Sequence, residues 1–290
     1  MKKSILLPSL SLVMGIVVFI LRKYQLANVK NVETQLYTPH ATETYLLMGA
    51  ILLFAVCLGL FLLSGGRELP NYTFTVYCPS PLFMATVVTG SFLYLLSTVV
   101  SIMDVQSQYA SYLENRSPMN PESFDFPFLT IVNMLLVVLV GMVMIYLGKQ
   151  AYRGEYLKEC WLTTLPAYMG LARLTVTYRN YGSLSSFQDN FYPIFGVMFL
   201  ALALYHLCAT AYVGPRPRKI VFFALVSVLF TGAMLASGIC LADKLLSLGS
   251  NLYLLAFSAA ILENTYSSRE NYRTPPPEEE DPQENSEVPV

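Results

Sequence analysis

Few residues in this 290-residue chain have the types and spacing that catalysis needs. Histidine occurs twice, as His40 and His206, and the five cysteines form no CxxC pair, so neither residue type predicts a metal centre or a redox pair. The sequence contains no HExxH, GxSxG or phosphate-binding GxxxxGK pattern. We therefore expect no catalytic residue, no cofactor and no metal, and the inventory does not favour an enzyme.

One of the two histidines, His206, lies inside an apolar stretch, six residues before the predicted end of that stretch at Tyr212. An ionisable residue within a membrane span is a candidate for proton transfer or substrate binding. The alternative is a neutral imidazole that hydrogen-bonds between helices, or a ring that reaches the inner headgroups. We favour this second role, because His206 has no acidic neighbour in the spans to act as a relay partner.

Arg173 is the one base placed inside a predicted span, about 6 Å from the outer end of that span. At this depth it can reach the headgroups or pair with a carboxylate. Asp104 and Asp243 are predicted to end two other spans in the same depth band, so we expect Arg173 to meet one of them. Asn133 is a further polar candidate, either lining a polar path or bonding to a neighbouring helix.

The elements that hold these residues are predicted to be membrane helices. The chain is 54% hydrophobic and 13% charged, with a mean hydropathy of +0.50, and this is about half the charge of an average soluble domain. The composition excludes a soluble enzyme, a disulfide-stapled secreted domain, a coiled coil and a disordered regulator. Because lipid admits only helices and closed barrels, we predict an all-α integral membrane bundle of about eight transmembrane helices.

The number of spans follows from the length of the apolar stretches, since a bilayer crossing takes about 20 mainly apolar residues. Six stretches meet this clearly, at residues 4–21, 44–63, 82–103, 128–147, 191–212 and 220–241. Two weaker ones, 160–177 with Pro166 and Arg173 and 245–262 with two serines and an asparagine, bring the count to eight, with six or seven as the alternatives. The first span is predicted to be an uncleaved signal anchor, because no small-x-small cleavage site follows it.

Small residues spaced four apart indicate where helices approach closely. Ala55 with Gly59 and Gly232 with Ala236 are such pairs. We interpret both as packing seams.

The charges predict how the chain is oriented. Cytoplasmic loops carry an excess of Lys and Arg, and eleven of the 18 bases lie on the inner side when the N-terminus is placed inside. The first outer loop opposes this rule with Arg22, Lys23 and Lys30. We predict a transmembrane domain at 1–264 with both termini cytoplasmic, an irregular acidic outer loop at 104–127, and an acidic, proline-containing disordered tail at 265–290.

Several segments of the chain are similar to a known group of membrane proteins. They are Thr177-Tyr-Arg-Asn, Leu200-Ala-Leu-Ala-Leu-Tyr-His-Leu and Gly214-Pro-Arg-Pro-Arg-Lys-Ile-Val-Phe-Phe-Ala-Leu, and Leu21-Arg-Lys-Tyr-Gln-Leu-Ala looks like the Leu-Arg-Arg-Trp-Gln-Leu-Ala of that group. Over nearly the whole chain except the tail, the sequence resembles uncharacterised polytopic membrane proteins of anaerobic Gram-positive (Clostridia-type) bacteria. The resemblance implies a bacterial plasma membrane and implies no activity and no site residue.

Two functions fit these observations. The first is a transporter, or transporter subunit, for a small solute or a lipid, because most bundles with scattered polar span residues and no catalytic motif have such roles. The second is a sensory or scaffolding membrane protein whose acidic tail docks a protein partner. Under either hypothesis the lipid bilayer is a constant partner and nucleic acid is not expected, while the small-molecule ligand stays unspecified.

Overall fold

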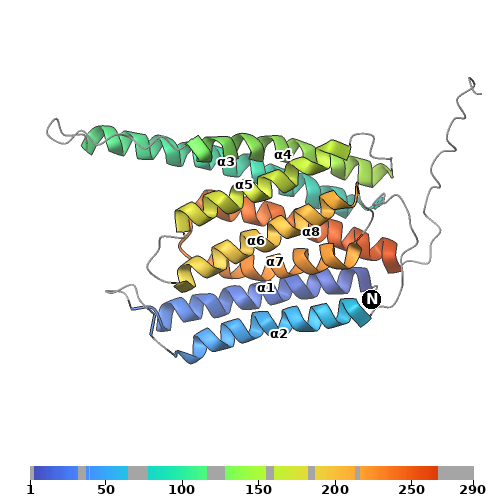
Figure 1. The fold of residues 1–290 in the computed structure, drawn as a ribbon, viewed down its shortest axis with the longest axis horizontal. Coiled ribbons are helices and arrows are strands. Elements are labelled where there is room, and N and C mark those ends of the chain that lie inside the picture. The colour runs from blue at the N-terminus through green and yellow to red at the C-terminus, as the bar shows by residue number, and fades with distance from the viewer. Residues whose placement is uncertain are drawn as a thin grey trace, which may run out of the picture.

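The computed structural model describes residues 3–31, 37–38, 40–64, 78–115, 128–154, 160–181, 187–212 and 216–266. These residues form eight α-helices that run side by side in one bundle (Figure 1). Their bounds are α1 Lys3–Asn28, α2 Thr42–Ser64, α3 Pro81–Asn115, α4 Phe128–Arg153, α5 Thr164–Tyr181, α6 Phe187–Ala209, α7 Pro217–Ala236 and α8 Leu241–Tyr266. The predicted all-α fold is confirmed.

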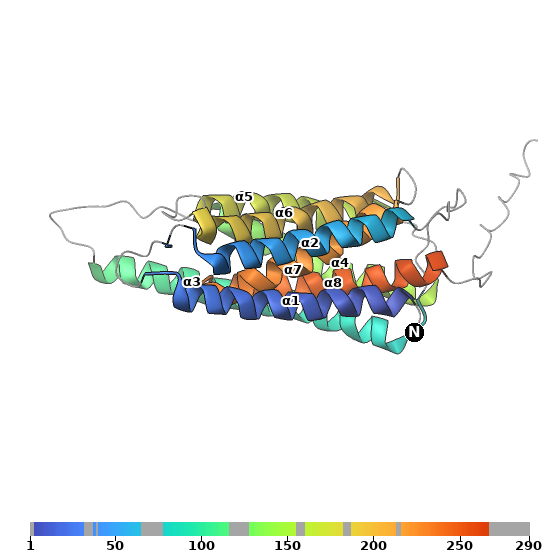
Figure 2. The same cartoon turned by 90° about the horizontal axis from the view of Figure 1, so that it is seen from below.

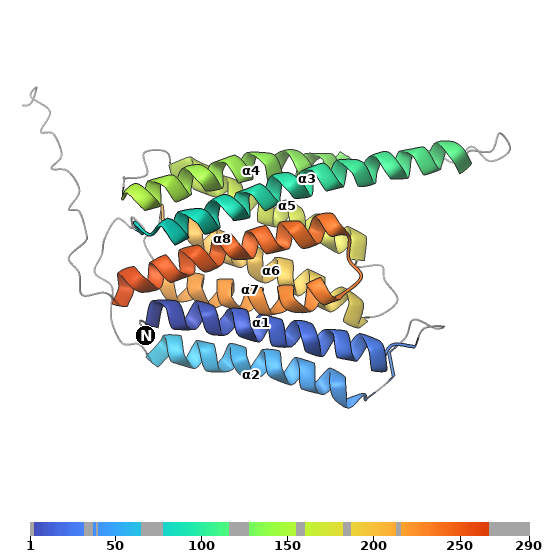
Figure 3. The same cartoon turned by 180° about the vertical axis from the view of Figure 1, so that it is seen from behind.

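Helices α7 and α8 lie at the centre of the bundle, with α5 and α6 on one side of them and α1 and α3 on the other (Figure 2). Helix α8 contacts α1, α3 and α7, while α7, α6, α5 and α4 contact one another in turn. The peripheral helix α2 contacts α1 and α7. Successive helices run in opposite directions, so α1 begins and α8 ends at the same end of the bundle (Figure 3). We call this the N-terminal end and the other the far end.

The outer surface of the bundle is apolar, as a bilayer requires. On α2 one stripe is buried against its neighbours, formed by Leu47, Ile51, Phe54, Leu58 and Leu62. Its other faces expose Leu52, Leu53, Leu60 and Leu63. Helix α2 is thus apolar on all sides. One face is covered by neighbouring helices, and the uncovered apolar face is suited to contact with lipid rather than water. The chain is therefore a multi-pass membrane protein.

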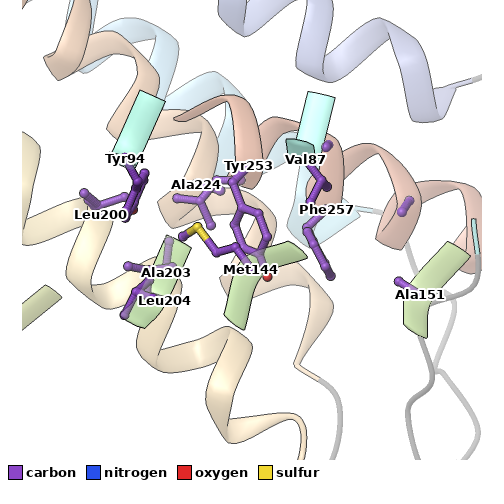
Figure 4. Close-up of a cluster of buried hydrophobic side chains, with 14 of the residues drawn as sticks. Val87, Tyr94, Met144, Ala151, Leu200, Ala203, Leu204, Ala224, Tyr253 and Phe257 are labelled. Carbon is purple, nitrogen blue, oxygen red and sulfur yellow. The ribbon is translucent and has the colours of Figure 1, made fainter. Parts of the chain in front are cut away.

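The larger part of the core lies where α3, α4, α6 and α8 meet (Figure 4). Tyr253 and Phe257 of α8 have ring centroids 4.5 Å apart, and Phe257 packs edge-on against Phe83 of α3. Met144 of α4 is fully buried beside them. These contacts fix α8 relative to α3 and α4.

Two pairs of glycines allow helices to approach closely. A side chain added at Gly232 of α7 would overlap the Gly15 carbonyl oxygen of α1, and one added at Gly249 of α8 would lie 2.7 Å from the Gly90 oxygen of α3. The predicted close approach at Gly232 is confirmed, whereas a side chain added at Gly59 of α2 would make only an ordinary contact, 3.5 Å from the Phe222 ring. The crossing of Gly90 and Gly249 has no four-residue signature, so the sequence did not reveal it.

Seven helices of the described chain are long and apolar enough to cross a bilayer, and α5 is the exception. Arg173 in its middle and Arg179 and Asn180 near its end lower its average hydropathy, but Arg173 is buried inside the bundle together with Met169 and Thr177. Its opposite face exposes Tyr168 and Leu171. Since hydropathy averages over all sides, it undervalues a helix whose polar face is covered by protein, and α5 takes its place in the bundle as an eighth helix.

Three predicted boundaries require correction. The predicted irregular loop 104–127 is helical as far as Asn115, because α3 continues beyond the ends of its neighbours (Figure 3). The predicted span 220–241 ends earlier, at Ala236, where Ser237 adopts an extended conformation before Gly238. The predicted span 160–177 becomes a short 3-10 turn, Cys160–Thr163, followed by α5, with Pro166 in its first turn where no amide donor is lost.

The predicted tail begins within α8, which extends to Tyr266. Residues 267–290 lie outside the described part of the chain.

Candidate functional site

Two buried arginines organise the polar interior of the far half of the bundle. Arg22 of α1 and Arg173 of α5 have relative exposures of 0% and 1%. A buried guanidinium is costly unless its charge and its donors are matched. The two arginines differ in how many of their hydrogen-bond donors have an acceptor and in whether a carboxylate balances the charge.

The first site, which we call the Arg22 cluster, comprises Arg22, Gln25, Lys30, Tyr37 and Asp189. Arg22 donates to Gln25 Oε1 at 2.6 Å, to Tyr37 Oη at 3.0 Å and to Asp189 Oδ1 at 2.9 Å. Tyr37 donates to the same carboxylate oxygen at 2.5 Å, and Lys30 Nζ lies 2.9 Å from Asp189 Oδ2. One carboxylate thus accepts from three donors.

Local structure brings these groups together. Asp189 lies in the first turn of α6, where the helix dipole favours a negative charge. An antiparallel bridge between Lys30 and Tyr37 sets both residues against the end of α1. Gln25 donates to Thr44 Oγ1 at 2.8 Å, which joins α1 to the start of α2. The cluster therefore ties α1, α2 and α6 together at the far end.

Aromatic and hydroxyl contacts complete the surroundings of Arg22. Its guanidinium lies 4.6 Å from the centre of the Tyr192 ring, and its Nε donates to Ser237 Oγ at 3.4 Å. Burial and the hydrogen bond to Asp189 raise the pKa of the Tyr37 hydroxyl above its ordinary value of 10.0. Tyr37 thus stays a donor at neutral pH, and the stability it adds is present below pH 10 and lost as the pH rises further.

The second site, the Arg173 cluster, comprises Arg173, Ser227, Thr231, Ser247 and Asn251. Arg173 Nη2 donates to Ser247 Oγ at 2.7 Å and to the main-chain carbonyl of Asp243 at 3.1 Å. Asn251 donates to Thr231 Oγ1 at 2.6 Å and to the Ser247 carbonyl at 2.9 Å, and it accepts from Ser227 at 3.2 Å. The cluster joins α5, α7 and α8 inside the apolar bundle.

The expected ion pair between Arg173 and an acid does not form. Asp243 contributes its main-chain oxygen, and it lies in the first turn of α8 rather than at the end of the preceding span. Asp104 is exposed on α3 and is not among the partners of Arg173. Arg173 lies eight residues, or about 12 Å, from the end of α5, because that helix continues past the predicted end at Thr177 to Tyr181.

The other sequence candidates lie apart from both clusters. His206 stacks on Phe223 with ring centroids 5.3 Å apart, near the N-terminal end, and its Nδ1 has no hydrogen-bond partner among the described residues. Asn133 lies in the second turn of α4, and its Oδ1 also lacks a described partner. Neither residue belongs to a cluster of polar side chains in the described structure.

Sequence reasoning identified Arg173 but missed the Arg22 cluster. Arg22 and Asp189 are separated by 167 residues, so no motif joins them. A signal was nevertheless present, because Arg22 and Lys30 are two of the three bases that oppose the charge rule in the first loop. Bases placed against the rule can be retained there by pairing with a carboxylate such as Asp189.

The described residues contain no group of three or more His, Cys, Asp and Glu side chains that could hold a metal ion. All five cysteines are free thiols. The two clusters offer charged and hydrogen-bonding groups.

Comparison with known proteins gives no family for this chain. No protein-family model, curated protein or solved structure matches it.

Proposed function

We propose that this multi-pass membrane protein is a transporter, or a transporter subunit, that binds a small solute or lipid inside its helical bundle. The observation that carries the proposal is the burial of Arg173 inside the bundle, with hydrogen-bond donors that no described residue accepts. Ionisable residues within membrane spans are expensive and typically mark solute or ion pathways. The hydroxyl groups beside Arg173 supply further polar contacts of the kind that orient a solute.

The membrane orientation belongs to the same proposal. The charge distribution favours cytoplasmic termini, and the resemblance to membrane proteins of Clostridia-type bacteria implies a bacterial plasma membrane. The pairing of Arg22 and Lys30 with Asp189 supports this orientation, because two of the bases that oppose the charge rule are held by a carboxylate at the far end.

Reporter fusions test the orientation. Fusions after Ser64 and Gln150, at the N-terminal end of the bundle, should report the cytoplasm with a fluorescent protein. Fusions after Asn31 and Asn115, at the far end, should report the outside with alkaline phosphatase. An outside signal at Gln150 would show that the orientation is inverted.

Solute-dependent stability tests the proposed function. We expect at least one small solute to raise the melting temperature of the purified protein, because a ligand that binds the folded state stabilises it. The same solute should then cross the membrane of liposomes that contain the protein and not that of empty liposomes. A chain without residues 274–290 should melt at the same temperature and respond equally, since those residues are too polar to build a core.

The tail comparison separates this proposal from the scaffolding hypothesis. A scaffold that docks a partner through the tail would lose a co-purified protein on truncation and would show no flux. That result would contradict the transport proposal.

A further inference from the structure

Arg173 has fewer hydrogen-bond acceptors around it than a buried guanidinium needs. A guanidinium carries five N–H donors. Those on Nη2 go to Ser247 Oγ and to the Asp243 carbonyl, whereas Nε and Nη1 have no hydrogen-bond partner among the described residues. Three donors of a side chain that is 1% exposed are therefore left without an acceptor.

Arg22 shows how this protein satisfies a buried arginine when the role is structural. Every nitrogen of Arg22 has an acceptor, and a carboxylate, Asp189, balances its charge. Arg173 is equally buried, but no carboxylate pairs with it within the described chain. The contrast indicates that the missing partner of Arg173 lies outside the described part of the chain.

The groups around Arg173 also exclude some ligands. The Ser247 hydroxyl gives its hydrogen to the Asp243 carbonyl at 2.7 Å, and the amide nitrogen of Asn251 is engaged with Thr231 and the Ser247 carbonyl. The three open donors of Arg173 thus bear the one positive charge of the Arg173 cluster. A cationic ligand would be repelled, and a neutral ligand would leave that charge unbalanced in a medium of low dielectric.

We infer that Arg173 is the recognition group of a binding site for a small, singly charged anion, with a carboxylate group as the preferred chemistry. A planar guanidinium matches the two oxygens of a carboxylate, and one negative charge balances one arginine. The inference deepens the proposed transport function and rests on it for the entry of the anion into the bundle.

Acetate is the probe for this site. The protein is placed in nanodiscs of pure phosphatidylcholine and titrated from 1 to 100 mM acetate, with a bulky sulfonate salt keeping the ionic strength constant. We expect the melting temperature to rise by about 3 °C or more across the titration. A parallel arm in nanodiscs with phosphatidylglycerol tests a lipid phosphate as the source of the anionic oxygens, and a high melting temperature that acetate no longer raises would identify the lipid.

Substitutions assign the effect to Arg173. Arg173→Gln should abolish the response to acetate, and Arg173→Lys, which keeps the charge but not the planar fork, should weaken the apparent affinity about 10-fold. Arg179→Gln is the matched control, because it removes the same charge from an exposed position on the same helix and should leave the response unchanged. An equal response of wild type and Arg173→Gln would overturn the inference.

Other outcomes are equally decisive. If Arg173→Gln does not fold, Ser247→Ala should weaken the acetate response by removing the neighbour of the guanidinium, and an unchanged response would count against the site. Stabilisation of the wild type by a neutral or cationic solute and not by anions would refute the anion while leaving the transport proposal intact. Acetate binding without flux in liposomes would support the site and refute transport.

Discussion

Asp189→Asn should be the most damaging single substitution of a polar residue, with a loss of about 3 kcal/mol or more in the free energy of unfolding. The change leaves the size of the side chain intact but removes the charge that balances Arg22, which is fully buried. Lys30 loses the same partner but is 24% exposed, so it can turn to water. The stranded Arg22 therefore dominates the loss, which is measured by denaturation of the purified protein.

Matched variants test whether the ion pair between Arg22 and Asp189 accounts for this loss of stability. Asp104→Asn removes the same charge from an exposed site on α3 and should change the stability by no more than about 0.5 kcal/mol. Arg22→Met combined with Asp189→Asn should be less harmful than Asp189→Asn alone, because no charge is stranded. Losses that simply add in this cycle would show that Arg22 and Asp189 do not depend on each other.

Gly232→Ala is expected to cost about 3 kcal/mol or more, although it adds one methyl group. That methyl would overlap the Gly15 carbonyl oxygen of α1. Main-chain atoms in a packed helix cannot turn aside as a side chain can, so α1 and α7 would have to separate along their contact. Melting of the purified protein and its yield in membranes measure the effect.

Gly49→Ala is the control for this prediction, because a side chain at Gly49 of α2 would have no atom within 4 Å. There the change should be neutral or stabilising by up to about 1 kcal/mol, since alanine favours helix more than glycine does. Equal effects at the two positions would mean that helix propensity, and not the close approach of α1 and α7, explains the loss at Gly232.

The sequence by itself determined the membrane environment and most of the helices. Apolar stretches as long as a bilayer is thick leave few alternatives, because backbone groups in lipid must bond within their own helix. Helices α2 and α4, which face lipid over much of their surface, were predicted within a few residues at their starts. Gly232 was also predicted correctly, since small residues four apart lie on one face of a helix.

Tertiary structure alone decided which polar residues meet. Arg22, Tyr37 and Asp189 come from α1, a loop and α6, and the hydrogen bonds that join them require a fold that brings distant segments to one point. The place of α5 was likewise undecided by hydropathy, because Arg173 counts as polar whether it faces lipid or protein, and Arg179 and Asn180 near the helix end lower the average further. Burial of that face within the bundle makes α5 an eighth helix, and it leaves Arg173 with donors that no described residue accepts. Sequence fixes the chemical groups that each segment carries, whereas their partners depend on contacts between segments far apart in the chain.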